Sequence, residues 1–147
     1  NQGNLKFIQF GYNFRMSEIQ ALLALVQLKK LTKIIHVRQK IWKIYKKALI
    51  PLGFKAQHIK TNVHFNVQSA TFIVPRGISA SELILKMKEK EIDCSIGTFS
   101  LSTIDYYLKK YKDPQKNSSF LMNNTITLPC FEGLNVEKVV KAIKLSL

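Results

Sequence analysis

The sequence predicts an α/β fold in which a long leading helix precedes a small sheet packed with helices. Three observations support this prediction. An apolar pattern with helical spacing runs over residues 17–50 without a proline or glycine, short strand-like segments follow Pro51, and an amphipathic pattern closes the chain from Asn135. A length of 147 residues fits one domain with its own core, or one piece of a larger enzyme.

The leading helix has a defined start. Ser17 and Gln20 form the S-x-x-Q pattern of a capping box, so the helix is expected to begin at Ser17. No helix breaker follows before Pro51, so the helix could run about 30 residues, or roughly 50 Å. A helix of this length usually spans more than one body. Its broad apolar stripe comprises Ile19, Leu22, Leu23, Val26, Leu31, Ile34, Ile35, Ile41, Trp42, Tyr45 and Leu49.

The rest of the chain alternates strands and helices. We expect two or three strands and at least three further helices. In chain order they are short strands up to Phe65, a strand over 69–75, a helix capped by Ser79 and ending at Lys90, a strand ending at Gly97, a helix ending near Tyr111, a strand in NTITLP, and a helix capped by Asn135.

The net charge of +14 is the one extreme value of the composition. It fits a nucleic-acid or anionic partner, a fragment whose acidic complement lies elsewhere, or a lysine-rich organism.

Basic residues step by four and three along one face of the leading helix, which favours a solvated face opposite the apolar stripe. No base-reading or stacking group is interleaved, so nucleic-acid binding is the less favoured alternative. The face comprises Lys29, Lys33, His36, Lys40, Lys43 and Lys47.

Several classes of protein find no support in the sequence. No apolar run reaches the ~18–20 residues of a membrane span, and no signal-peptide pattern begins the chain. The chain also lacks an initiator Met, so we expect a fragment of something longer. Cys94 and Cys130 stand alone in apolar settings, which predicts buried free thiols in a reducing cytoplasm.

Spacing alone reveals no complete active site. The three histidines, His36, His58 and His64, show no ligand spacing, so we expect no metal site. The P-loop, the G-x-G-x-x-G pattern and the G-x-S-x-G pattern do not occur. The nine acidic residues are spread out and offer no centre for paired-carboxylate chemistry.

The stretch GYNFRMSEIQALLALVQLKKL resembles the G-Y-N-[YF]-R-M-[ST]-E-[LIM]-Q-A-A-[LI]-G-x-x-Q-L signature of the DegT/DnrJ/StrS sugar aminotransferase family. Ala24 stands where that signature has its Gly. Further similarities follow in order, in RQKIWKIYKKAL, in SATFIVPRGISASELILKMKEKEIDCSIG and in ITLPCFEGLNVEKVVKAIK. The resemblance extends from Phe10 to Leu147.

This resemblance implies the fold type I aminotransferase architecture, in which a large domain holds pyridoxal 5'-phosphate (PLP) on a lysine. The chain would then comprise a linker and cofactor-edge loop (1–16), a long inter-domain helix (17–50) and a small C-terminal α/β domain (51–147). The implied reaction transfers an amino group, usually from glutamate, to a keto sugar linked to a nucleotide. The family's lysine lies upstream of its GYN motif, so no catalytic residue is expected in this fragment, which should be inactive alone.

The resemblance also assigns candidate site residues. In the family, the Asn of GYN reaches across a homodimer and donates its amide to the cofactor phosphate, which implies that role for Asn13, with Arg15 as a second candidate. TFSLSTIDYY resembles the Y-x-x-L-H-x-x-P-Y-Y loop, so Phe99 and Ser102 become the substrate-binding candidates. Ser102 and Asp105 replace the family's His and Pro. These departures leave open a degenerate relative that keeps the fold and dimer interface but regulates or scaffolds.

Overall fold

The structure, a computed structural model, describes residues 10–12, 14–113 and 115–147. The chain divides into two compact units, with the boundary after Thr32. Helix α1, Glu18–Leu49, contains that boundary, so each part of the helix belongs to a different unit.

The first unit contains the start of α1. The predicted capping box is confirmed, because the Ser17 N–H donates to Gln20 Oε1 (3.0 Å) and the Gln20 N–H donates to Ser17 Oγ (3.3 Å). Every residue of α1 in this unit is exposed. The exposure of its large apolar side chains ranges from 41% to 74%, and they are Ile19, Leu22, Leu23, Leu25, Val26, Leu28 and Leu31.

The second unit begins with the rest of α1, whose apolar side chains are buried. Trp42 is 9% exposed, while Tyr45 and Leu49 are fully buried. The helix gives way to a 3₁₀ turn over Ile50–Leu52, and Gly53 follows with a φ of 91°. Only glycine adopts this left-handed conformation at little cost, so Gly53 lets the chain turn back toward the sheet.

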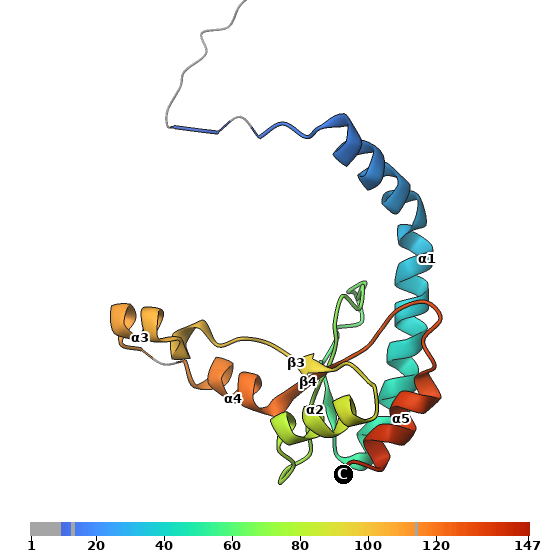
Figure 1. The fold of residues 1–147 in the computed structure, drawn as a ribbon, viewed down its shortest axis with the longest axis vertical. Coiled ribbons are helices and arrows are strands. Elements are labelled where there is room, and N and C mark those ends of the chain that lie inside the picture. The colour runs from blue at the N-terminus through green and yellow to red at the C-terminus, as the bar shows by residue number, and fades with distance from the viewer. Residues whose placement is uncertain (1–9, 13, 114) are drawn as a thin grey trace, which may run out of the picture. The chain divides into compact units, whose positions relative to one another are not determined.

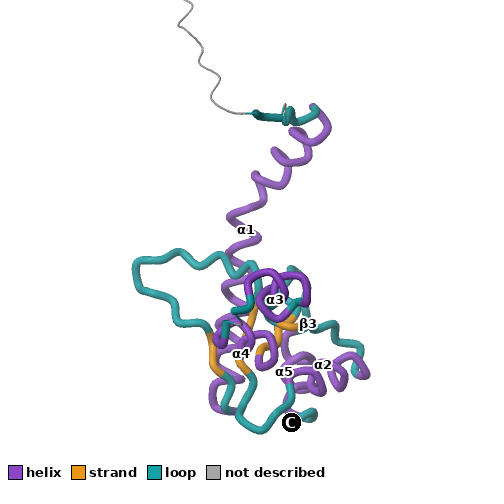
Figure 2. The backbone as a smooth tube through the Cα atoms, turned by 90° about the vertical axis from the view of Figure 1, so that its left-hand side faces the viewer, coloured by secondary structure: helices purple, strands orange, loops and turns teal. Residues whose placement is uncertain are grey.

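The sheet is antiparallel and has the strand order β1-β2-β4-β3. Its strands are β1 (Lys55–Ala56), β2 (Ala70–Ile73), β3 (Ser95–Ile96) and β4 (Thr125–Leu128). The centre of the sheet pairs Phe72 with Ile126, both buried. The described residues thus form four strands, against the two or three predicted, and each of them lies in a segment that the sequence marked as strand-like. Figure 2 shows how little of this unit is strand.

Four α-helices follow α1 in the part of the chain that the structure describes: α2 (Ala80–Glu89), α3 (Asp105–Tyr111), α4 (Lys116–Asn124) and α5 (Val136–Lys144). The predicted caps are confirmed, since Ser79 Oγ accepts from the Glu82 N–H (3.3 Å) and Asn135 Oδ1 accepts from the Lys138 N–H (2.9 Å). Helix α2 packs against β3, β4, α4 and α5 (Figure 1). Helix α4 was not predicted.

The core of the second unit joins α1 to the sheet and to the closing helix. The rings of Tyr45 and Phe72 meet edge to face at 6.3 Å, and the Tyr45 hydroxyl donates to the Pro129 carbonyl at 2.9 Å. Leu83 and Met87 of α2 and Ile143 of α5 complete this core. Burial of each such side chain contributes about 1.5–3 kcal/mol, so the end of α1 is an integral part of this unit.

The structure corrects the prediction for the two thiols. Cys94 and Cys130 are free, as predicted, but both are half-buried rather than buried. Both pack against the core as partly buried residues, Cys94 directly before β3 and Cys130 two residues after β4. Within the described residues, no helix has the combination of length and apolar character that crossing a membrane requires.

Candidate functional site

The predicted cofactor edge belongs to the first unit. Asn13 lies outside the described residues. Arg15 is described and exposed. The rings of Tyr12 and Phe14 are also exposed and contact each other, with centroids 5.6 Å apart.

Both predicted substrate-binding residues line one cavity of the second unit. This cavity measures about 580 Å³, a volume within the usual range of small-molecule sites. Phe99 is 70% exposed there, and Ser102 is half-buried. The cavity is lined by Phe99, Leu101, Ser102, Tyr107, Tyr111, Asp113, Gln115 and Ser118.

A network of hydroxyl groups fixes the floor of this cavity. Ser100, buried, lies 3.1 Å from the Ser102 oxygen and 3.0 Å from the Ser118 oxygen. Ser102 Oγ accepts from the Gln115 N–H at 3.0 Å, at the start of α4. This hydrogen bond satisfies an amide that the helix itself cannot pair. Ser102 therefore ties the loop to α4 while it lines the cavity.

Aromatic rings form another wall. The rings of Tyr107 and Tyr111 are stacked, with centroids 6.4 Å apart and planes at 10°. Asp113 Oδ2 accepts from the Gln115 side-chain amide at 2.8 Å. Ring faces and hydroxyls suit a ligand with both apolar faces and hydroxyl groups, such as a sugar. Sequence reasoning missed both tyrosines, although the run DYYLKKY already signalled an aromatic cluster.

The structure offers no activated nucleophile among the thiols. Burial, and then the charge of Asp93, raise the pKa of Cys94 to about 12. Burial also raises the pKa of Cys130, although the charge of Arg38 opposes that shift. Both thiols therefore stay protonated at neutral pH, whereas a nucleophilic cysteine needs its thiolate. In the part of the chain that the structure describes, no group of three or more His, Cys, Asp or Glu residues could hold a metal ion.

The predicted basic face of α1 is exposed along its whole length, from Lys29 to Lys47. Lys33 forms an ion pair with Glu132 at 2.7 Å, and both side chains are largely exposed. Such surface pairs contribute little to stability. The face has the solvated character that the sequence favoured.

Comparison with known proteins gives a family match over almost the whole sequence. The model of the DegT/DnrJ/EryC1/StrS aminotransferase family matches residues 1–144. Among solved structures, Helicobacter pylori PseC, an aminotransferase of pseudoaminic acid biosynthesis, is similar with a TM-score of 0.83 and 19% identity over 96% of this chain. A family aminotransferase from Brucella abortus is similar with a TM-score of 0.80 and 18% identity over 98% of this chain.

A third similar structure contains the cofactor. It is the PLP form of Spr1654 from Streptococcus pneumoniae, whose name assigns it to the sugar aminotransferases, with a TM-score of 0.81 and 21% identity over 96% of this chain. The likeness at these identities concerns the fold. The chain spans 40% of the PseC chain, 39% of the Brucella chain and 38% of the Spr1654 chain.

Proposed function

Because the chain belongs to the DegT/DnrJ/EryC1/StrS aminotransferase family, we propose that it is the C-terminal part of a PLP-dependent sugar aminotransferase. The full-length enzyme transfers an amino group from glutamate to a keto sugar linked to a nucleotide. The observation that carries this proposal is the family match over residues 1–144. This match also implies a separate role for each of three segments of the chain.

In this proposal, residues 1–16 are a linker and cofactor-edge loop, 17–50 an inter-domain helix and 51–147 the small C-terminal domain. The exposed apolar face of the first half of α1 supports this division. A face with side chains such as Leu22 (62% exposed) and Leu28 (64% exposed) is unusual on a monomer's surface and typical of an interface. The chain spans only 40% of the PseC structure, so the large domain of the full-length protein is the occupant we propose for this face.

The cofactor-edge loop holds the phosphate of PLP. The donor set fits this group, since an Asn amide is a neutral N–H donor and an Arg guanidinium binds phosphate oxygens in a planar fork. When bound, PLP supplies the electron sink that amino transfer requires. Asn13 and Arg15 orient its phosphate, Asn13 doing so for the partner subunit of a homodimer. The lysine that carries PLP is contributed by the large domain.

The sugar substrate occupies the cavity lined by Phe99 and Ser102. Phe99 offers an open ring face, and Tyr107 and Tyr111 offer two more. Ser102 acts through the loop, because its oxygen accepts the Gln115 amide that anchors α4. The small side chain of Ser102 also leaves room for the substrate where the family has an imidazole. The reaction takes place in the cytoplasm, where the half-buried thiols stay reduced.

The first experiment measures whether the full-length protein takes up PLP. We expect a bound-PLP absorbance band that disappears on borohydride treatment, with the cofactor then fixed on a lysine upstream of residue 1. Glutamate should convert the bound cofactor to its amino form, and a nucleotide-linked keto sugar should restore it. A full-length protein that takes up no PLP contradicts the proposal.

Asn13→Ala tests the phosphate contact separately. Loss of a hydrogen bond to a charged group costs about 1.5–3 kcal/mol, so PLP should be retained roughly ten- to a hundredfold more weakly. The circular dichroism spectrum should be unchanged. Gln9→Ala, four residues earlier in the same loop, is the matched control and should retain PLP normally. Equal PLP retention in the Asn13→Ala variant and the wild type would remove Asn13 from the site.

Two other outcomes correspond to the competing functions. A protein that binds PLP yet transfers no amino group to any keto sugar is the degenerate relative, with a regulatory or scaffolding role. Nucleic-acid binding by the basic face would appear as affinity that falls steeply with salt, by about one log unit per phosphate contact for each log of salt concentration. No binding at low salt excludes that function.

A further inference from the structure

A group of exposed apolar side chains surrounds helix α3 in the second unit. Their exposure ranges from 37% to 70%, and the group, here called the α3 patch, comprises Phe99, Leu101, Tyr106, Tyr107, Leu108 and Tyr111. Single exposed apolar residues are normal on a protein surface, whereas a contiguous group indicates an interaction site. Tyr106 and Leu108 do not line the substrate cavity, so that cavity does not account for the whole patch.

Helix α3 has little support from its own chain. None of its seven residues is buried, and within the described residues it packs mainly against the 3₁₀ turn η2, Leu101–Thr103. Figure 1 shows it at the outer end of this unit, beyond α4. An isolated helix shorter than about 12 residues is marginal in water. The packing within the chain therefore does not explain why this short helix forms.

The ends of α3 also lack the usual stabilising groups. Its N-cap residue, Ile104, makes no side-chain hydrogen bond to the first turn, whereas Ser, Thr, Asp or Asn would accept one there. Its C-cap residue, Lys112, has a φ of 52°, a left-handed conformation that glycine adopts at much lower cost. Local sequence thus adds little to the stability of α3, and a contact outside the described residues would supply what is missing.

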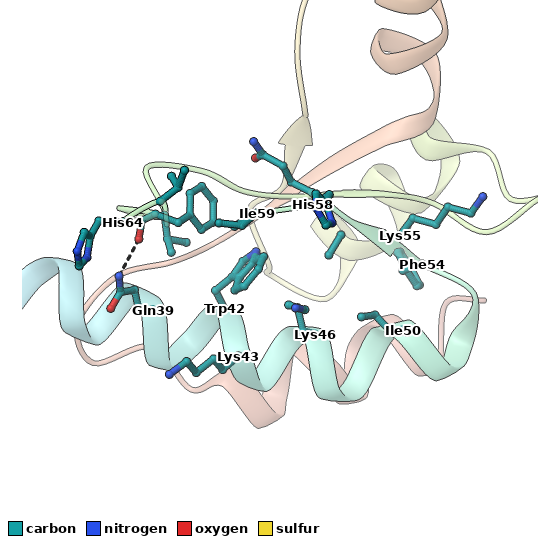
Figure 3. A pocket seen from close by; sticks show the side chains of 15 residues that line it. Gln39, Trp42, Lys43, Lys46, Ile50, Phe54, Lys55, His58, Ile59 and His64 are labelled. Atoms are coloured by element: carbon teal, nitrogen blue, oxygen red, sulfur yellow. Dashed lines mark hydrogen bonds between the residues drawn. The ribbon is translucent and has the colours of Figure 1, made fainter. Parts of the chain in front are cut away.

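The segment 54–67 of the same unit shows the opposite case, because its own chain holds it. Gln39 Nε2 donates to the Phe65 carbonyl at 2.7 Å (Figure 3), and the rings of Phe65 and Trp42 meet edge to face at 5.1 Å. Arg38 also donates to the Val67 carbonyl at 3.3 Å. Among the described residues, no side chain of α3 makes a comparable hydrogen bond to the rest of the unit.

Positive charge accompanies the α3 patch. Residues 99–120 contain four lysines and two aspartates, all exposed: Lys109, Lys110, Lys112, Lys116, Asp105 and Asp113. The ion pairs found among the described residues involve none of these lysines. Lys110 Nζ instead lies 5.3 Å from the centroid of the Tyr111 ring. A second copy of this surface would bring like charges together and be repelled, whereas an acidic surface would be attracted.

We propose that the α3 patch docks onto an acidic surface of the large domain of the full-length protein. The chain spans only 40% of the PseC chain, and its net charge of +14 calls for acidic groups elsewhere in the protein. Tyr107 and Tyr111 of the same helix line the substrate cavity, so docking also fixes one wall of that cavity. The inference rests on the proposed function only in requiring a large domain.

Hydrogen exchange of the α3 amides in the full-length protein tests the docking. A seven-residue helix without a partner is open most of the time, so its amides exchange nearly as fast as those of a free peptide. We expect the docked helix to exchange at least about a hundredfold more slowly. Raising the salt concentration from about 0.1 M to 1 M shortens the reach of charges from about 10 Å to 3 Å and should speed this exchange at least about threefold.

Two alanine variants provide a matched comparison. Tyr106→Ala removes a ring that is 66% exposed and does not line the cavity. Because alanine is the better helix former, an undocked α3 would exchange more slowly in this variant. A docked α3 should instead exchange at least about tenfold faster, since it loses an interface ring. Leu85→Ala removes a comparably exposed side chain (61%) from α2 and should leave the exchange of both helices within about twofold.

Three results would overturn the inference. The first is exchange of the α3 amides at the rate of a free peptide, and if the same protein takes up PLP, the proposed function stands without the docking. The second is equal or slower exchange of α3 in Tyr106→Ala. The third is exchange that does not respond to salt, which removes the acidic surface, or that slows as the protein concentration rises, which assigns the patch to a second copy. A protected, salt-sensitive α3 in a protein without PLP uptake would contradict the proposed function alone.

Discussion

The two halves of α1 carry the same apolar pattern but meet different surroundings. In the second half, Tyr45 and Leu49 are fully buried against the sheet and α5. In the first half, Leu22 and Leu28 are more than 60% exposed. An apolar stripe with helical spacing predicts which side chains favour burial, but it does not say which part of a protein buries them. The proposed answer for the first half is the large domain of the full-length enzyme.

The largest expected effect tests the buried half. Leu49→Ala should lower the free energy of unfolding by about 2–5 kcal/mol, because it leaves a cavity in the core around Tyr45 and Phe72. Chemical denaturation measures the change. Lys47→Ala, two residues earlier and exposed, is the matched control and should stay within about 0.5 kcal/mol. Similar small effects from both variants would mean that this end of α1 is not part of the core.

The next effect tests the exposed half. Leu22→Asp in the full-length protein should lower the free energy of unfolding by at least about 2 kcal/mol, because the proposed interface would bury an unpaired charge. Denaturation followed by circular dichroism measures it. His36→Asp places the same carboxylate on the exposed basic face and serves as the control. If Leu22→Asp is as mild as His36→Asp, nothing covers Leu22 and the interface proposal fails.

The third prediction concerns alkaline pH and the second unit alone. Burial raises the pKa of Cys94 to about 12 and also raises the pKa values of Cys130 and Tyr45. A raised pKa in the folded state stabilises the protein fully below the unfolded pKa, near 8.5 for cysteine, and this stability is lost as the pH rises toward 12. The free energy of unfolding should therefore fall over this window, by at most about 1.4 kcal/mol per pH unit for each proton.

Denaturation curves recorded between neutral and alkaline pH measure this loss. Cys94→Ala should make the fall shallower, because the unfolded chain then releases one proton fewer. An unchanged slope in Cys94→Ala would show that the environment of this thiol does not resist ionisation.

The smallest effect compares the helix caps of the two regions. Ser79→Ala removes the Oγ that accepts from the Glu82 amide and should cost about 1 kcal/mol of global stability. Ser17→Ala removes the equivalent acceptor of the Gln20 amide at the exposed start of α1. It should speed hydrogen exchange of the first-turn amides with less than about 0.5 kcal/mol of global effect, because the described residues of that turn are exposed. A global cost equal to that of Ser79→Ala would contradict the difference between the regions.

The sequence predicted the features that depend on local chemistry. The caps at Ser17, Ser79 and Asn135 were readable because each side chain bonds an amide three residues away. Helix α4 was missed because KNSSFLMNN is rich in poor helix formers. In addition, the amide of its N-cap residue, Gln115, is paired by Ser102, thirteen residues earlier in the chain. Such a contact depends on the fold and has no signature in a single sequence.

The candidate site was predictable only in part. The family resemblance pointed to Phe99 and Ser102, and the structure shows them on one cavity. The stacked Tyr107 and Tyr111 were left out, because seven helical residues with aromatics and lysines could equally form a surface helix. Residue spacing could not reveal that Ser102 is also a helix anchor. The role of Asn13 remains a prediction, since that residue lies outside the described part of the chain.

The most direct test of the central claim measures the accessibility of position 22 in the full-length protein. Leu22→Cys and Lys40→Cys place single new thiols on the apolar and basic faces of the same helix, and the two native thiols, with raised pKa values, should react slowly. We expect a thiol reagent to label Lys40→Cys at the rate of a free peptide. We expect it to label Leu22→Cys at least about a hundredfold more slowly, because exposure of that thiol requires an opening of the interface. Equal labelling rates at the two positions would contradict it.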